Sequence, residues 1–219
     1  LRPSAHVNLI PLNPTPGYPT RGTPLRRVHE FAVREYKAGN YVVVGGDNVG
    51  GGYAATKHLL ELGRRKIAFF GDIDNPENAA RHNGYLKALE EYGIPNNPEL
   101  EVNVPFDMQG AREVIVEFLE SGIEPDAVVC ISDVMALAAL STFQDVGLRV
   151  PQDIAVVGYD DISLAAYSSP ALTTVRQNIR HAGRILVESI LGLIRGEDVP
   201  DTTLSSELVL RKSSGARND

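Results

Sequence analysis

Two runs of consecutive apolar residues, 127–131 and 154–157, constrain the fold of this chain more than any other feature. The segment between them has the apolar spacing of a helix, and Gly147 marks its end. Two buried strands joined by a helix are typical of a β-α-β unit in a parallel sheet covered on both faces. We therefore predict an α/β fold whose binding site lies at the carboxyl ends of these strands.

Polar residues follow both runs. Ser132 and Asp133 come after the first run, and Asp160 and Asp161 come after the second. Carboxylate and hydroxyl groups at this edge of the sheet suit hydrogen bonding to a polar ligand. Each carboxylate also has a structural alternative, because Asp133 can cap the next helix and the other two can form only a turn and a cap.

Several motifs follow one another in order from near residue 41. They are Asp47-Asn48 followed by Gly51-Gly52, Arg81-x-x-Gly84-Tyr85, Ser132-Asp133-x-Met135-Ala136-Leu137, Val150-Pro151-x-Asp153-Ile154, Val157-Gly158-Tyr159-Asp160-Asp161 and Pro170-x-Leu172-Thr173-Thr174-Val175. Together these motifs resemble the effector-binding domain of the lactose/galactose-repressor (LacI/GalR) family of bacterial transcription regulators. The resemblance implies an α/β fold like that of periplasmic binding proteins, with two lobes that each contain a doubly wound parallel sheet.

The resemblance also implies how the chain divides into lobes. We expect the first lobe to be incomplete, because its opening strands and helices have no counterpart in this sequence. The expected ranges are 1–78 and 172–197 for the first lobe, 79–171 and 205–213 for the second, and 214–219 for a tail.

Residues 1–40 do not match this family. The segment 6–14 is similar instead to a strand near the end of radical-SAM methyltransferases that modify an rRNA adenine. Methyltransferase activity is not expected, since the one cysteine, Cys130, cannot hold an iron–sulfur cluster. We therefore expect either a repressor-type effector domain or, as the alternative, a truncated or engineered chimera that keeps the scaffold without binding an effector.

The resemblance assigns ligand contacts to the cleft between the lobes. Arg81 matches the family's cleft arginine, and its planar guanidinium suits sugar hydroxyls or a carboxylate. Asp160 is expected to accept hydrogen bonds from the ligand, with Ser132 and Asp133 at the neighbouring strand end. Phe106 falls near a position where the family places an aromatic side chain. The alternatives are an Arg81 paired along its own helix and a Phe106 folded onto the core.

The expected function is to sense a sugar or related metabolite for a repressor-type transcription regulator. Ligand binding would favour one arrangement of the lobes and so change DNA affinity. DNA would be contacted through a helix-turn-helix domain absent from this chain, and the net charge of −7 agrees with that division. Self-association as a dimer is also expected.

Other classes of function lack their signals in this sequence. The glycines of 45–52 fit neither a dinucleotide fingerprint nor a P-loop, and no metal-spaced cluster or nucleophile motif is present. We therefore predict no enzyme, no cofactor and no metal. No apolar run reaches about 18 residues, so no membrane span is expected. A single buried cysteine favours a cytoplasmic location.

Overall fold

The computed structural model describes residues 42–215, which form two compact units. The larger unit comprises Gly46–Asn178 and the chain from Ser205 on, and the smaller includes Ile179–Leu204. The methyltransferase-like segment and the rest of 1–40 lie outside the described residues.

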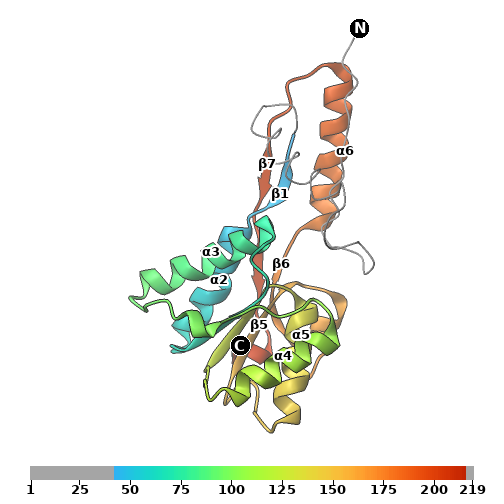
Figure 1. The fold of residues 1–219 in the computed structure, drawn as a ribbon. Coiled ribbons are helices and arrows are strands. Elements are labelled where there is room, and N and C mark those ends of the chain that lie inside the picture. The colour runs from blue at the N-terminus through green and yellow to red at the C-terminus, as the bar shows by residue number, and fades with distance from the viewer. Residues whose placement is uncertain (1–41, 216–219) are drawn as a thin grey trace, which may run out of the picture. The chain divides into compact units, whose positions relative to one another are not determined.

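The larger unit is built on a six-stranded sheet with the strand order β3-β2-β4-β5-β6-β8 (Figure 1). The first five strands run parallel, and β8 is antiparallel to β6. The carboxyl ends of the parallel strands therefore meet at one edge of the sheet. The strands are β2 (Ile67–Phe70), β3 (Glu101–Val102), β4 (Ala127–Cys130), β5 (Ala155–Asp160), β6 (Thr173–Arg176) and β8 (Glu207–Val209).

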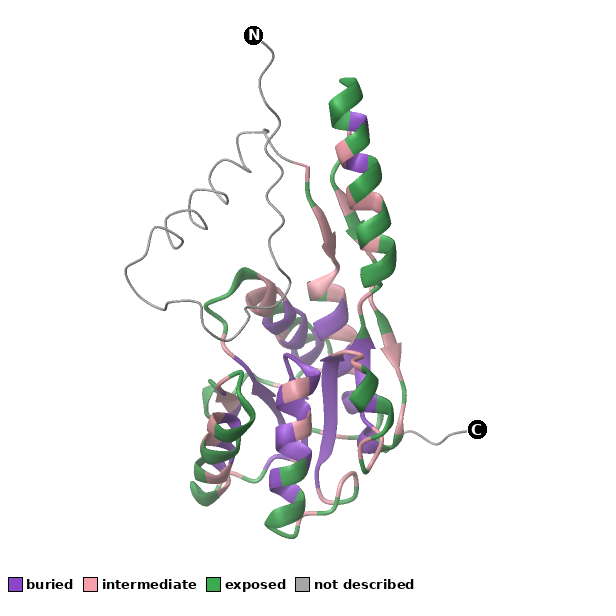
Figure 2. Cartoon of the chain, turned by 90° about the vertical axis from the view of Figure 1, so that its right-hand side faces the viewer, coloured by how far each residue is buried: buried purple, intermediate pink, exposed green. Residues whose placement is uncertain are grey.

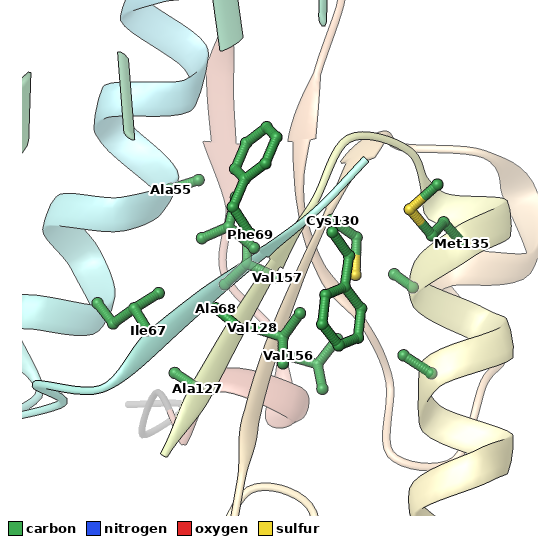
Figure 3. Packing of buried hydrophobic residues seen from close by; sticks show 14 of the residues in the cluster. Ala55, Ile67, Ala68, Phe69, Ala127, Val128, Cys130, Met135, Val156 and Val157 are labelled. Atoms are coloured by element: carbon green, nitrogen blue, oxygen red, sulfur yellow. The ribbon is translucent and has the colours of Figure 1, made fainter. Parts of the chain in front are cut away.

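Helices cover both faces of this sheet. Adjacent residues of β2 point to opposite faces, and each meets a different helix. Phe69 packs against Tyr85 of α3 with ring centroids 5.3 Å apart, whereas Phe70 packs against Phe118 of α4 at 5.5 Å. Figure 3 shows the same division, with Ala55 of α2 on one side of the strands and Met135 of α5 on the other. The helices are α2 (Asn48–Glu61), α3 (Pro76–Glu91), α4 (Met108–Glu120) and α5 (Asp133–Asp145).

The core lies between the sheet and these helices (Figure 2). Every residue of β2 and β4 is buried, as expected for parallel strands covered on both faces. Burying each large apolar side chain contributes about 1.5–3 kcal/mol. Cys130 is fully buried, which confirms the prediction for this thiol.

Capping residues fix the ends of two helices. The side chain of Asp47 accepts a hydrogen bond from the backbone N–H of Gly50 and caps α2. The end of α5 is followed by Gly147 at a φ of 83°, a conformation that glycine adopts without a steric penalty.

The smaller unit contains α6 (Ile179–Arg195), strand β7 (Thr202–Leu204) and the first two residues of strand β1 (Val44–Gly46), and β1 pairs with β7. The backbone N–H of Thr202 donates to the Val43 carbonyl oxygen at 2.8 Å. Across residues 42–215, no helix is long and apolar enough to cross a membrane.

The larger unit begins earlier in the chain than the predicted lobe boundary at residue 79. Helix α2 packs against α3, and β2 pairs with β4 from Ile67↔Ala127 to Phe70↔Cys130. Strand β6, expected in the first lobe, pairs with β5. The strand and helix signals around 46–78 are local, so they do not specify which sheet these elements join.

Candidate functional site

The candidate site lies at the carboxyl edge of the six-stranded sheet, where β4 and β5 end and α3 passes over them. Arg81 of α3 is its most buried cation, with 7% of its surface exposed. A charge removed from water to this extent needs hydrogen-bond partners that hold it in place.

Arg81 has such partners on two different elements. Its Nε donates to Oδ1 of Asn48 at 2.9 Å, and its Nη1 donates to the carbonyl oxygen of Ile131 at 2.5 Å. The guanidinium carbon lies 3.9 Å from the ring centroid of Tyr159. Within residues 42–215, Nη2 makes no hydrogen bond, so the guanidinium keeps donor capacity for a ligand.

Two glycines explain how Asn48 reaches Arg81. A Cβ at Gly52 of α2 would lie 2.0 Å from the carbonyl oxygen of Arg81, and a Cβ at Gly84 of α3 would lie 2.1 Å from the carbonyl oxygen of Val49. The backbones of α2 and α3 therefore touch where both residues lack a side chain. This close crossing places the start of α2 beside the second turn of α3.

Asp160 ends β5 next to this arginine. Its φ of 111° is rare for a residue other than glycine. Its Oδ1 accepts a hydrogen bond from Nε2 of Gln177 at 2.8 Å. Burial raises the pKa of the Asp160 carboxyl group, and the positive charge of Arg81 offsets part of that rise. Within the described chain, its Oδ2 has no hydrogen-bond donor.

Asp161 continues the same turn with a φ of 53°. Its carboxylate accepts hydrogen bonds from Nε of Arg176 at 2.7 Å and from Nη2 of Arg211 at 2.6 Å. Both of its oxygens are therefore used inside the protein. Asp161 stabilises the turn, whereas Asp160 keeps an acceptor available.

Ser132 and Asp133 follow β4 and have different roles. Ser132 caps α5, because its Oγ accepts from the backbone N–H of Met135 at 3.3 Å. The cap is thus not Asp133, which was the structural alternative in the sequence. Asp133 is fully buried, and its carboxylate accepts from Oγ1 of Thr174 at 2.5 Å and from the backbone N–H of Ile162 at 2.8 Å. Burial raises the pKa of Asp133 to about 7.

The structure brings three of the five predicted contacts to one place. Arg81 bonds to the residue before Ser132 and stacks on the residue before Asp160. Asp133 lies behind this edge rather than on it. Phe106 lies in the loop before α4 with 41% of its surface exposed, so it is not folded onto the core. No aromatic ring contact is made by Phe106 within residues 42–215.

Three residues of this edge were not predicted as site residues. Asn48 and Tyr159 were each considered only as part of a motif. Gln177 follows β6, the strand next to β5, and a polar residue at the carboxyl end of a strand is the signal that could have identified it.

The described residues contain no group of His, Cys, Asp or Glu side chains arranged to hold a metal ion. His58 contacts Oγ of Ser214 at 2.9 Å, and burial lowers the pKa of its imidazole. Ser214 is itself buried, so this pair connects α2 to the short 3-10 helix Lys212–Ser214 inside the protein.

Comparison with known proteins agrees with this fold. Residues 56–214 match the model of the periplasmic binding protein-like domain. The chain belongs to this family. The predicted fold class, an α/β fold of the periplasmic-binding-protein type with parallel strands, is thereby confirmed.

Among curated proteins, the domain is similar to the HTH-type transcriptional repressor PurR of Aliivibrio salmonicida. The two are 40% identical over 166 residues, which is 74% of this chain and 50% of the repressor. The periplasmic binding protein-like domain described here spans about half the length of the curated relatives that it matches.

Two solved structures are similar to it in fold. One is the complex of the transcriptional regulator CelR with cellobiose, with a TM-score of 0.74, 36% identity, and coverage of 78% of this chain and 54% of that chain. The other is a LacI family transcriptional regulator from Enterococcus faecium with bound ribose, with a TM-score of 0.72, 29% identity, and coverage of 78% and 65%. These relatives are transcription regulators and not enzymes.

Proposed function

We propose that this domain is the effector-binding part of a LacI-type transcription regulator and that it binds a sugar or a related metabolite rich in hydroxyl groups. Arg81 and Asp160 are the main contacts, one as donor and the other as acceptor. Ser132 adds a hydroxyl group at the end of β4.

The arrangement of Arg81 carries this proposal. The guanidinium is buried, fixed by Asn48 and Ile131, and stacked on Tyr159. Yet its Nη2 is unused within residues 42–215, and so is Oδ2 of nearby Asp160. A polyol offers both an acceptor and a donor in each hydroxyl group, so it can satisfy both side chains together.

The relatives support the ligand class. Two of the similar structures contain bound sugars, cellobiose in one and ribose in the other. Both are sugars that present adjacent hydroxyl groups. Because these two regulators share the fold of this chain, their bound sugars favour a sugar over a nucleotide or a metal ion as the effector.

DNA contact and assembly belong to the same proposal. The similar repressor is named as an HTH-type protein, and the match covers half of it. We assign operator contact to a helix-turn-helix domain outside residues 1–219, and we expect a dimer of a regulator that acts in the cytoplasm. Sedimentation equilibrium of the purified chain measures its oligomeric state.

The test is ligand-induced stabilisation of the purified chain. Cellobiose, ribose and other mono- and disaccharides are screened by thermal shift, and each positive result is titrated calorimetrically. A ligand that binds only the native state at 100 times its Kd stabilises that state by about 2.7 kcal/mol. Asp160→Asn removes the negative acceptor and should weaken binding.

Asp153→Asn is the matched control. Asp153 precedes β5 as Asp160 ends it, and its carboxylate pairs with Arg149 at the protein surface. This variant should bind like the parent. A chain that melts cooperatively but responds to none of the sugars would overturn the proposal and favour a scaffold without effector binding.

A further inference from the structure

Asp133 occupies an unusual position for a carboxylate. It is fully buried behind the candidate site, where no arginine or lysine forms an ion pair with it within the described residues. Its two oxygens accept hydrogen bonds from β6 and from the turn after β5. A buried carboxylate without a cation is costly, so its contacts define what it does.

Its contacts all concern the turn that carries Asp160. Oδ2 of Asp133 accepts from the backbone N–H of Ile162, two residues beyond Asp160. Oδ1 accepts from the Thr174 hydroxyl group, whose oxygen in turn lies 3.4 Å from the backbone N–H of Asp161. Asp133 therefore holds the second half of the turn directly and its middle through Thr174.

That turn needs such support. Asp160 and Asp161 both have positive φ, at 111° and 53°. Positive φ in residues other than glycine is strained and persists where surrounding contacts enforce it. Arg176 and Arg211 hold the Asp161 side chain from the outside, and Asp133 holds the backbone from the inside.

The chain also makes room for this carboxylate. A Cβ built on Gly158 of β5 would lie 2.3 Å from Oδ1 of Asp133. Any larger residue at 158 would displace the carboxylate from the strand. Glycine at this position thus allows Asp133 to reach between β5 and β6.

We infer that Asp133 is a positioning residue for ligand binding: by holding the Asp161–Ile162 backbone and Thr174, it fixes the strained turn that aims the Asp160 carboxylate. Asp133 does not touch the ligand itself. The inference rests on the proposed function for its binding consequence, whereas its effect on the turn is a property of the protein alone.

The experiment compares Asp133→Ala with Asp126→Ala. Asp126 immediately precedes β4, and its carboxylate accepts from the backbone N–H groups of Arg65 and Lys66 at 2.7 and 3.1 Å. Both aspartates therefore hold a turn of backbone at an end of the same strand, but Asp126 lies at the opposite edge of the sheet. Both variants should lose stability, so stability alone does not distinguish them.

Two readouts distinguish them. Hydrogen exchange of the Ile162 amide should accelerate in Asp133→Ala and stay at the parent's rate in Asp126→Ala. Affinity for ribose or cellobiose, whichever binds the parent, should fall roughly ten- to a hundredfold in Asp133→Ala, the range found for hydrogen-bond partners behind metal ligands. Asp126→Ala should stay within about twofold of the parent. Asp133→Asn, which keeps one acceptor, should recover part of the lost affinity.

A folded Asp133→Ala protein with the parent's exchange at Ile162 overturns the inference. If the parent binds neither sugar, the proposed function fails, and the exchange rates still decide whether Asp133 fixes the turn. If Asp133→Ala does not fold, Thr174→Val replaces it, with Thr142→Val as control. Thr142 is a buried threonine whose hydroxyl group bonds within α5, away from this edge.

Discussion

The guanidinium of Arg81 stacks on the ring of Tyr159 at 3.9 Å, which couples α3 to the end of β5. A cation over an aromatic ring contributes about 0.5–2 kcal/mol, more where water is excluded. This geometry makes Arg81 both a structural residue and a candidate ligand contact.

Replacing Arg81 with methionine should therefore affect stability as well as binding. Met fills a similar volume but leaves the Ile131 carbonyl oxygen and the Asn48 amide without their donor. Each unsatisfied buried polar group costs about 1–3 kcal/mol. We expect Arg81→Met to lower the free energy of unfolding by about 2–4 kcal/mol in urea titrations.

The control for this prediction is Arg112→Met on α4. Arg112 forms an exposed ion pair with Asp145, and such pairs contribute about 0–1 kcal/mol. Equal losses of stability in the two variants would contradict the structural role of Arg81.

Local features of this fold were predictable from the sequence, whereas long-range partners were not. The apolar runs that became β4 and β5, the Asp47 cap and the glycine after α5 each depend on neighbouring residues only. The pairing of β2 with β4 depends on packing between distant segments, so no local sequence signal specifies it.

The site shows the same limit. Arg81 and Asp160 were predicted through a family motif, and their partners Asn48 and Gln177 were missed. Those partners lie 33 and 17 residues away in sequence, respectively. Asp133 was predicted either to contact the ligand or to cap α5. No sequence signal distinguishes these roles from that of a carboxylate that accepts hydrogen bonds from a neighbouring turn.

The close crossing of α2 and α3 gives a second prediction. Gly52→Ala would place a Cβ 2.0 Å from the Arg81 carbonyl oxygen, so the helices must separate. Overpacking of this kind costs about 1–3 kcal/mol. It should also weaken sugar binding, because Asn48 and Arg81 move apart. Urea unfolding and calorimetric titration measure the two effects.

Gly183→Ala is the matched control for this substitution. Gly183 lies within α6, and no described atom is within 4 Å of a Cβ built there. Replacing glycine with alanine in an open helix should stabilise the protein by up to about 1 kcal/mol. A stabilising effect at both positions would show that the α2–α3 contact is looser than described.

The buried carboxyl group of Asp133 predicts how stability depends on pH. Burial raises its pKa from 3.8 to about 7, so the folded protein holds this proton over a pH range in which the unfolded chain has lost it. The contribution of the Asp133 carboxyl group to the free energy of unfolding is fully present below about pH 4. It is lost as the pH rises towards 7. The loss is on the order of 4 kcal/mol, from about 1.4 kcal/mol per pKa unit over a rise of about three units.

Urea titrations between pH 4.5 and pH 7.5 measure this loss. Asp133→Asn carries no titrating group at this position, so its stability should fall less over the same range. Burial also raises the pKa of Asp160, which remains in both proteins and cancels in the difference. Identical pH profiles for parent and variant would show that Asp133 titrates normally.

Cys130 gives a direct probe of how this core opens. Burial raises the pKa of its thiol, so the reactive thiolate is scarce in the native state. Labelling with a thiol reagent should require opening of β4, which lies at the centre of the sheet between β2 and β5. The labelling rate of Cys130 in the native protein should be on the order of a thousandfold or more below that of the unfolded chain, since core strands open at close to the global free energy of unfolding.

The control is the double variant Cys130→Ala with Glu120→Cys. It places the thiol on the exposed end of α4, where the thiol should react at the rate of a free cysteine. Rapid native labelling of Cys130 itself would mean that the central strand separates from α5 without global unfolding.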